Sequence, residues 1–273
     1  MQRWIDSFWH GQLKQPYDLA KTYDSGSGSA IVMLHGIGRS AEVWRHLTRL
    51  LKSRDVKCRV IAYDLLGFGR SPKPDRINYT VDDQATAVIA SLKRLPKSAK
   101  PIIIVGHSMG CLVAVRVAKR RPDLVRHLVL YEMPIYEGLP EKWRYQARIN
   151  IYFRFYEWVI RQNPSFEEAS QKFKERIAGK VAGSELTRET WQPFIKSLQN
   201  TIMKQTAAQD LPTLTMPADI IYGSRDLLVI RGKVHEVLGL DSKLVTFHTI
   251  KERHVLSPSA SKFIAERIKY ALL

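Results

Sequence analysis

Residues 106–110 read Gly-His-Ser-Met-Gly, and this stretch decides the fold of the chain. The aliphatic residues 102–105 before it are typical of a buried parallel strand, and residues 109–121 after it have the pattern of a helix. Small residues two positions before and after the serine avoid a clash in a tight turn between strand and helix. Such a turn lifts the hydroxyl of Ser108 above the edge of the sheet and directs the amino end of the helix at developing negative charge. The stretch therefore predicts a nucleophilic serine.

Short apolar strands and amphipathic helices alternate on both sides of this stretch. Thr80 and Asp83 also form a capping pattern at the start of one helix. The alternation predicts an α/β fold, with a mostly parallel sheet that is covered by helices on both faces. We expect strands at 17–25, 30–34, 59–63, 102–105, 128–131, 220–222 and 244–250, and helices at 41–52, 81–92, 109–121 and 259–272.

The alternation stops between residues 134 and 211, where no convincing strand occurs. The periodicity there predicts helices at about 145–160, 165–178 and 187–207. We therefore divide the chain into a first part of the α/β core, a helical insertion and a second part of the core. These parts are residues 1–133, 134–211 and 212–273.

A serine hydroxyl is a poor nucleophile unless a base activates it and an acid orients that base. His254 follows the last expected strand and precedes the last helix, which makes it the candidate base. Asp226 lies just after the strand at 220–222 and is the candidate acid, with Glu132 as an alternative at the end of an earlier strand. The tetrahedral intermediate also needs two amide donors, which we expect from the backbone of Met109 and Ile37.

The other histidines are weaker candidates for the base. His107 faces the wrong way inside the turn to serve Ser108, and His35 has the position of a structural residue in a His-Gly loop. The remaining histidines lie in helices, strands or the N-terminal segment without the context of a site: His10, His46, His127, His235 and His248.

The net charge of the chain is +17, from 43 Lys and Arg against 26 Asp and Glu. This charge predicts either a solvated basic surface or attraction to an acidic partner, an anionic substrate or an anionic membrane surface. No nucleic-acid-binding fingerprint accompanies it, so we expect no specific nucleic acid. The densest basic cluster contains Arg116, Lys119, Arg120, Arg121 and Arg126.

The two cysteines, Cys58 and Cys111, lie in apolar patterns and predict buried thiols rather than a disulfide framework. No Cys/His cluster has zinc-ligand spacing, so we expect no metal. A serine nucleophile with its own base and acid needs no cofactor, so we expect none. Asp6 and His10 interrupt any secretion signal near the N-terminus, and no apolar run approaches the roughly 20 residues of a membrane helix. We expect a soluble, cytoplasmic protein.

These motifs together resemble those of the α/β-hydrolase superfamily. The matching stretches, in family order, are 34–38 (Leu-His-Gly-Ile-Gly), 64–71 (Asp-Leu-Leu-Gly-Phe-Gly-Arg-Ser), 106–110, and 222–226 (Tyr-Gly-Ser-Arg-Asp) with His254. The resemblance implies a central sheet flanked by helices and makes the insertion an all-helical lid. Two residues depart from the common pattern, since Leu66 stands where many relatives have proline and Arg253 where they have glycine.

The resemblance implies a serine hydrolase that cleaves small-molecule carboxylic esters with an apolar acyl or alcohol group through an acyl-enzyme. C–C bond hydrolases, lactonases and cofactor-free perhydrolases use the same triad, whereas Ser108 argues against the classes with an aspartate nucleophile. Two other interpretations stay open: a methyl esterase that acts on esters of acidic acyl carrier protein, and a non-catalytic ligand-binding receptor. Aromatic residues of the insertion are the candidates for contact with substrate, namely Tyr145, Tyr152, Phe153 and Tyr156.

Overall fold

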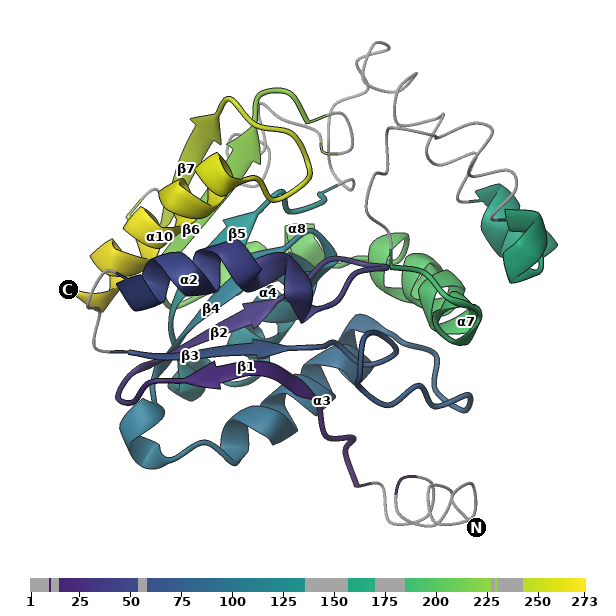
Figure 1. Cartoon of the computed structure of the whole chain (residues 1–273), viewed down its shortest axis with the longest axis horizontal. Coiled ribbons are helices and arrows are strands. Elements are labelled where there is room, and N and C mark those ends of the chain that lie inside the picture. Colours follow the sequence, from purple (N-terminus) through teal and green to yellow (C-terminus); the bar gives the residue numbers. More distant parts are fainter. Residues whose placement is uncertain are drawn as a thin grey trace.

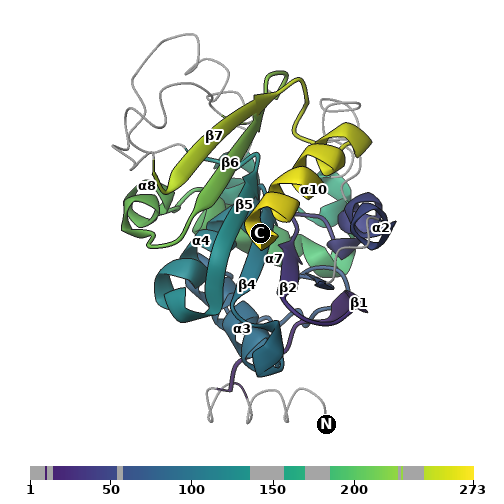
Figure 2. The same ribbon diagram turned by 90° about the vertical axis from the view of Figure 1, so that its left-hand side faces the viewer.

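The structure is a computed structural model of the 273-residue chain. It describes residues 10, 15–53, 58–135, 157–169, 185–226, 229 and 243–273. One twisted sheet runs through the described part, and helices cover both of its faces (Figures 1 and 2).

Within these described ranges, the sheet has seven strands in the order β1-β3-β2-β4-β5-β6-β7. Of these strands, only β1 runs antiparallel to its neighbour, and every other pairing is parallel. Each expected strand is present, so the predicted sheet is confirmed. The strands are β1 (Lys21–Ser25), β2 (Ala30–Leu34), β3 (Arg59–Tyr63), β4 (Ile102–His107), β5 (Val125–Tyr131), β6 (Ala218–Gly223) and β7 (Val245–Ile250).

Helices α2 (Arg45–Ser53) and α10 (Pro258–Leu272) lie side by side on one face of the sheet, and α3 (Val81–Lys93) and α4 (Met109–Arg120) lie together on the other (Figure 1). The predicted cap of α3 is present as a capping box between Thr80 and Asp83. Two further α-helices are α7 (Arg188–Ser197) and α8 (Ala207–Asp210), and a π-helical turn is η5 (Leu198–Ile202). The short 3-10 helices are η2 (Ala41–Trp44), η3 (Lys97–Ala99), η4 (Pro122–Leu124) and η6 (Leu211–Thr213).

The central strands are buried on both faces, which explains why their sequences are continuously apolar. In β4, Ile103 and Val105 pack toward α2 and α10, whereas Ile102 and Ile104 pack into the core under α3 and α4. Burial of each such side chain contributes about 1.5–3 kcal/mol relative to exposure. The sheet thus has one apolar core on each face. The two cores hold the sheet in place, and with it the loops that leave the carboxyl ends of its strands.

The described part of the insertion contains helices and irregular segments but no strand, as expected. Residues 157–162 and 166–169 are helical, and the helical segment that we expect over 187–207 is present but interrupted at residues 203–206. The structure has α7, η5, a break and then α8. Thr206 lies at the break, where its hydroxyl donates to Asp210 at 2.8 Å and its carbonyl accepts the first amide bonds of α8.

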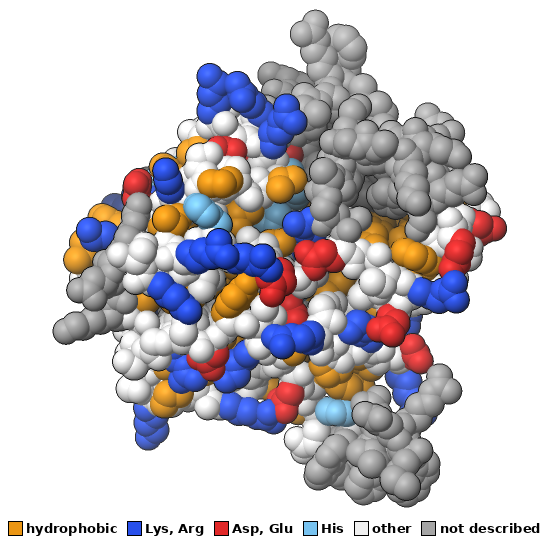
Figure 3. Space-filling model, in the orientation of Figure 1, with side chains coloured by type: hydrophobic (Ala, Val, Ile, Leu, Met, Phe, Trp, Pro, Cys, Tyr) orange, Lys and Arg blue, Asp and Glu red, His pale blue; other side chains and the backbone are white. Residues whose placement is uncertain are grey.

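Four of the five residues in the basic cluster pair with three carboxylates of the described chain, Asp82, Asp123 and Asp210. Arg116 and Lys119 both contact the buried carboxylate of Asp210, at 3.0 and 2.7 Å. Arg120 lies 3.6 Å from Asp82, and Arg121 pairs with Asp123 two positions away. Basic side chains are likewise scattered over the face in Figure 3, and several adjoin acidic ones. Among the described residues, no helix combines the length and apolarity that crossing a bilayer requires.

Candidate active site

Ser108 lies in a strained turn between β4 and α4. Its φ is 52° and its ψ is −119°, a combination that L-residues rarely adopt. Glycine is required on both sides of it: a Cβ on Gly110 would lie 2.2 Å from the carbonyl oxygen of Leu34, and one on Gly106 would lie 2.7 Å from the Cα of Cys111. The amide of Ser108 donates to the carbonyl of Tyr131 at 3.0 Å. The turn therefore has the tight geometry that the sequence predicts.

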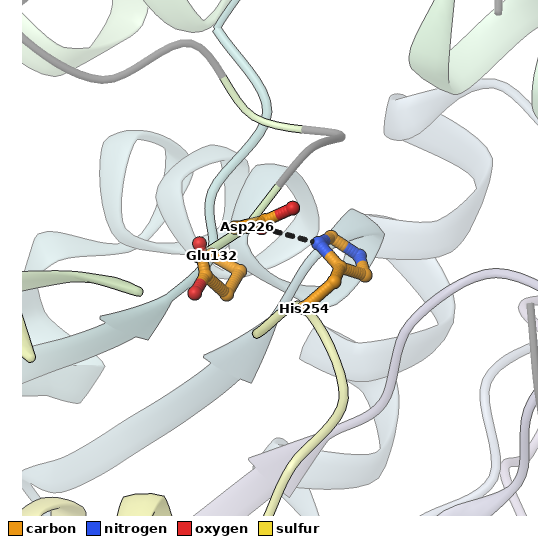
Figure 4. A group of neighbouring side chains, drawn as sticks. All are labelled: Glu132, Asp226 and His254. Carbon is orange, nitrogen blue, oxygen red and sulfur yellow. Dashed lines mark hydrogen bonds and ion pairs between the residues drawn. The ribbon is translucent and has the colours of Figure 1, made fainter. Parts of the chain in front are cut away.

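Three residues predicted to act together are joined by hydrogen bonds. The Nε2 atom of His254 lies 3.1 Å from the Oγ atom of Ser108. The Nδ1 atom of the same ring lies 2.7 Å from the Oδ2 atom of Asp226, and Figure 4 shows this second bond. An ionised Asp226 accepts from Nδ1–H, which leaves Nε2 to accept from the serine hydroxyl. Asp226 is only 2% exposed, so its bond to the imidazole is shielded from water. The arrangement can transfer a proton from Ser108 to His254.

The alternative acid, Glu132, binds a different partner. Its Oε1 atom accepts from the amide of Gly223 at 2.5 Å, whereas Asp226 occupies the position at Nδ1 of His254. Each of the three bonded residues stands just after the carboxyl end of a parallel strand: Ser108 after β4, Asp226 after β6 and His254 after β7. This is the edge of an open α/β sheet where ligands bind.

The loop of His254 is held by two side chains that sequence reasoning did not find. The Nε2 atom of His107 lies 2.8 Å from the carbonyl oxygen of His254, and the hydroxyl of Tyr131 donates to the carbonyl of Arg253 at 2.7 Å. The two rings stack with centroids 5.6 Å apart. Burial lowers the pKa of His107 to about 3, so its ring is neutral at pH 7 and can donate from Nε2. As predicted, His107 does not serve Ser108.

The loop after β2 places Gly36, the residue before Ile37, beside the nucleophile. A Cβ on Gly36 would lie 3.2 Å from the Cβ of Ser108, so the loop backbone packs closely on the serine. His35 holds this loop through two hydrogen bonds of its ring. The Nε2 atom accepts from the amide of Leu65 at 2.9 Å, and the Nδ1–H group therefore donates to the carbonyl of Gly36 at 2.8 Å. Burial lowers the pKa of His35 to about 4, which keeps it neutral.

His35 thereby sets the direction of the amide of Ile37. In a trans peptide the carbonyl and the next amide point in opposite directions, so anchoring the Gly36 carbonyl anchors the Ile37 N–H as well. The amide of Met109 opens the first turn of α4, where amides have no partner within the helix. The use of Ile37 and Met109 as oxyanion donors stays a prediction.

The stretch 64–71 holds neighbouring loops in place through hydrogen bonds. Asp64 accepts from the amides of Ala41 at 2.7 Å and Arg70 at 2.9 Å. Leu66, which replaces a common proline, donates its amide to the side chain of Gln84 at 3.1 Å. Proline has no amide hydrogen and could not make this bond.

The aromatic candidates Tyr145, Tyr152, Phe153 and Tyr156 lie outside the described residues. Other residues of the insertion do reach the loop after β2. The amide of Glu185 donates to the carbonyl of Gly38 at 2.9 Å, and Leu186 and Phe194 lie against the same glycine. The sequence offered no signal that would select these two apolar residues from the many in the insertion.

The model of the alpha/beta hydrolase family matches residues 31–258, which is most of the chain. The chain belongs to the alpha/beta hydrolase family. It is 37% identical over 135 residues to 2-hydroxymuconate semialdehyde hydrolase of Pseudomonas sp. (strain CF600), a match that covers 45% of this chain and 44% of that protein. It is 26% identical over 253 residues to a probable esterase of Oryza sativa subsp. japonica, covering 85% and 87%.

A further match, to the haloalkane dehalogenase of Agrobacterium fabrum, is 37% identical over 111 residues and covers 41% of this chain and 34% of that protein. The chain thus spans less than half the length of several curated relatives. Among solved structures, an esterase from Thermogutta terrifontis aligns with a TM-score of 0.67 at 20% identity, covering 93% of this chain and 92% of that one. Haloalkane dehalogenase DbeA from Bradyrhizobium elkani gives 0.68 at 21%, covering 93% and 97%. These structures confirm the expected fold.

Proposed function

We propose that the chain is a serine hydrolase that cleaves carboxylic esters through an acyl-enzyme on Ser108. The observation that carries this proposal is the chain of hydrogen bonds from Asp226 through His254 to Ser108. A serine in the strained turn forms an ester intermediate that water can hydrolyse with the same histidine as base. The haloalkane dehalogenase match does not change this assignment, because residue 108 is serine.

In the proposed reaction, Ser108 attacks the carbonyl carbon of the ester while His254 accepts the hydroxyl proton. Asp226 keeps the imidazole in the productive tautomer and stabilises the imidazolium. The amides of Ile37 and Met109 hold the oxyanion, and His254 then returns its proton to the leaving alcohol. A water molecule, deprotonated by His254, hydrolyses the acyl-enzyme in a second round of the same steps.

The substrate that fits this proposal carries an apolar acyl or alcohol group. Ile37 is partly buried and packs against the apolar core, and Leu186 and Phe194 lie against the neighbouring Gly38. We propose residues 134–211 as a lid over the site, between core segments 1–133 and 212–273, with Tyr145, Tyr152, Phe153 and Tyr156 among its substrate contacts. Differences in the lid would then set specificity.

Cleavage of a C–C bond is the second candidate. The match to 2-hydroxymuconate semialdehyde hydrolase favours it, although that match covers less than half of either chain. The two chemistries are distinguished by products: the ester reaction releases an alcohol and an acid, whereas the C–C reaction releases two fragments from a ketone without an ester bond.

Hydrolysis of p-nitrophenyl acetate, butyrate and octanoate tests the proposal. We expect wild type to turn over at least one of them, and Ser108→Ala to lose at least about a thousandfold in kcat/KM. Ser53→Ala, an exposed serine on α2, is the matched control and should behave as wild type. Equal turnover by wild type and Ser108→Ala would assign the reaction to another group.

A further inference from the structure

Arg39 is a half-buried arginine on the loop after β2, two positions beyond the proposed oxyanion donor Ile37. Its side chain is 23% exposed. A guanidinium carries five N–H donors, and a cation removed from water normally has its donors paired. Within the described residues Arg39 makes no side-chain hydrogen bond, and its ion-pair partner is Glu185, whose Oε1 atom lies 3.9 Å from the Nε atom of Arg39. Most donors of this guanidinium are therefore available to an acceptor from outside the chain.

The loop that carries Arg39 packs against the nucleophile. A Cβ on Gly36, three positions before Arg39, would lie 3.2 Å from the Cβ of Ser108. Burial lowers the pKa of His35 and of His107, and the charge of Arg39 lowers both pKa values further. His35 precedes Gly36 in the loop, and His107 precedes Ser108 in the chain. The positive charge of Arg39 therefore acts on residues beside the nucleophile.

The ion pair with Glu185 is too weak to keep Arg39 from another partner. The 3.9 Å separation is long for an ion pair, and the side chain of Glu185 is 43% exposed, so water screens the attraction. A substrate carboxylate at about 2.7–2.9 Å would form shorter and stronger charge-assisted bonds. The amide of Glu185 separately donates to the carbonyl of Gly38 at 2.9 Å. Arg39 can thus exchange its partner while the insertion stays attached to the loop.

The edge of the sheet around the proposed triad carries exposed cations but no exposed acid in the described loops after β2, β5, β6 and β7. The exposed cations are Arg225, Lys251 and Arg253. The side chains of Glu132 and Asp226 are buried, and Glu252 is half-buried and accepts a hydrogen bond from Ser259. An anion that approaches the site therefore meets a positive potential.

We propose that Arg39 binds a carboxylate of the substrate, so that the chain prefers esters with a carboxylate on one side of the ester bond and an apolar group on the other. The planar guanidinium fork matches the two oxygens of a carboxylate. Arg39 and Ile37 belong to one loop, so a carboxylate bound to Arg39 orients the ester carbonyl toward the proposed oxyanion donors. Arg39 is thus a specificity-determining residue, and this role rests on the proposed hydrolase function.

Two pairs of esters test the preference, and in each pair an isopropyl group replaces the carboxylate at nearly the same size. Monobutyl succinate and butyl 4-methylpentanoate differ on the acyl side, whereas butyryloxyacetate and isobutyl butyrate differ on the alcohol side. We expect wild type to favour the carboxylate in one pair by at least about tenfold in kcat/KM, measured by acid release. Equal cleavage within both pairs, or faster cleavage of both neutral esters, would overturn the proposal.

Substitution of Arg39 assigns the preference to one side chain. In Arg39→Gln, the ratio of kcat/KM between the carboxylate ester and its neutral partner should fall at least about tenfold. Arg39→Met, which keeps an apolar stem in the half-buried position, serves if the glutamine variant does not fold. Arg49→Gln removes an exposed cation from α2 with the same change in net charge and should keep the wild-type ratio. An unchanged ratio in the Arg39 variants, or an equal fall in Arg49→Gln, would overturn the proposal.

A binding measurement keeps this proposal separate from the hydrolase proposal. Ser108→Ala cannot form the acyl-enzyme, so monobutyl succinate acts on it as a ligand. At about 20 mM, this monoester should raise the Tm of Ser108→Ala by at least about 1 °C over equimolar sodium chloride, and the rise should vanish when Arg39→Gln is added. No rise, or a rise that survives Arg39→Gln, would overturn the carboxylate site. A rise that depends on Arg39 in a protein whose wild type cleaves no ester would support the site and count against the hydrolase function alone.

Discussion

The strained backbone of Ser108 depends on the two glycines that flank it. We predict that Gly110→Ala lowers the free energy of unfolding by about 2–4 kcal/mol, because its Cβ would lie 2.2 Å from the carbonyl of Leu34 and backbone would have to shift. Urea denaturation measures this loss. Glu266→Ala, an exposed change on α10, should alter stability by less than about 0.5 kcal/mol. A Gly110→Ala protein as stable as wild type would show that the turn has more room than described.

The hydroxyl of Tyr131 is predicted to position the base. Tyr131→Phe removes the bond to the carbonyl of Arg253, and a lost hydrogen bond of about 1–1.5 kcal/mol corresponds to roughly a tenfold fall in kcat/KM. The matched control is Tyr222→Phe, since the buried hydroxyl of Tyr222 has no hydrogen-bond partner among the described residues. Equal effects of the two substitutions would show that the bond to the His254 loop is not what matters.

Two buried neutral histidines predict loss of stability in acid. The pKa values of His35 and His107 are about 4 and about 3 in the folded chain, below their ordinary value of 6.5. The unfolded chain therefore binds more protons below pH 6.5, and stability falls as pH falls from there toward 4. At pH 5 each histidine contributes a loss of about 2 kcal/mol. Unfolding free energies at pH 7 and pH 5 measure it, and His35→Gln should weaken the dependence.

At the scale of the elements, α4 is joined to the insertion by ion pairs. Asp210, on α8, is 3% exposed and binds both Arg116 and Lys119. We predict that Asp210→Asn lowers the free energy of unfolding by about 3 kcal/mol, because it removes the buried carboxylate that Arg116 and Lys119 share. The exposed pair of Arg121 and Asp123 offers the control, since Asp123→Asn should cost less than about 1 kcal/mol. Equal losses would contradict the special role of Asp210.

The elements also show what local sequence could and could not predict. The strands at 30–34 and 59–63 have the predicted bounds, because continuous aliphatic runs between turn residues leave few alternatives. The break in the helical segment expected over 187–207 was not predicted, because Thr206 and Asp210 at this break have cationic partners about 90 positions away along the chain. Periodicity within a window contains no information about such partners.

Contacts between segments that lie far apart in the chain were likewise not predicted from the sequence. His127 and His248, which we expected to lie outside any site, both contact the buried carboxylate of Asp219, at 2.8 and 2.6 Å. Arg267 of α10 contacts it as well, so this cluster ties three strands to one helix. By contrast, the order of Ser108, Asp226 and His254 along the chain was enough to predict the hydrogen-bonded set, because each follows a strand of one parallel sheet.

At the scale of the whole molecule, the fold alone does not determine the reaction. Solved structures named as esterases and as haloalkane dehalogenases share it at about 20% identity. The chemistry is instead decided by side chains at the carboxyl ends of the strands. The net charge of the chain is +17, and on α4 basic side chains pair with nearby acids. Neither the fold nor the net charge identifies the reaction, so the functional proposal rests on the residues of the site.

Labelling with a fluorophosphonate tests the central claim most directly, because the reagent needs an activated serine but no knowledge of the substrate. Wild type should bind one label per chain, and peptide mapping should place it on Ser108. Ser108→Ala should bind none, and His254→Ala should react far more slowly although its serine is intact. A folded wild type that resists the reagent, or a label on another residue, would contradict the account.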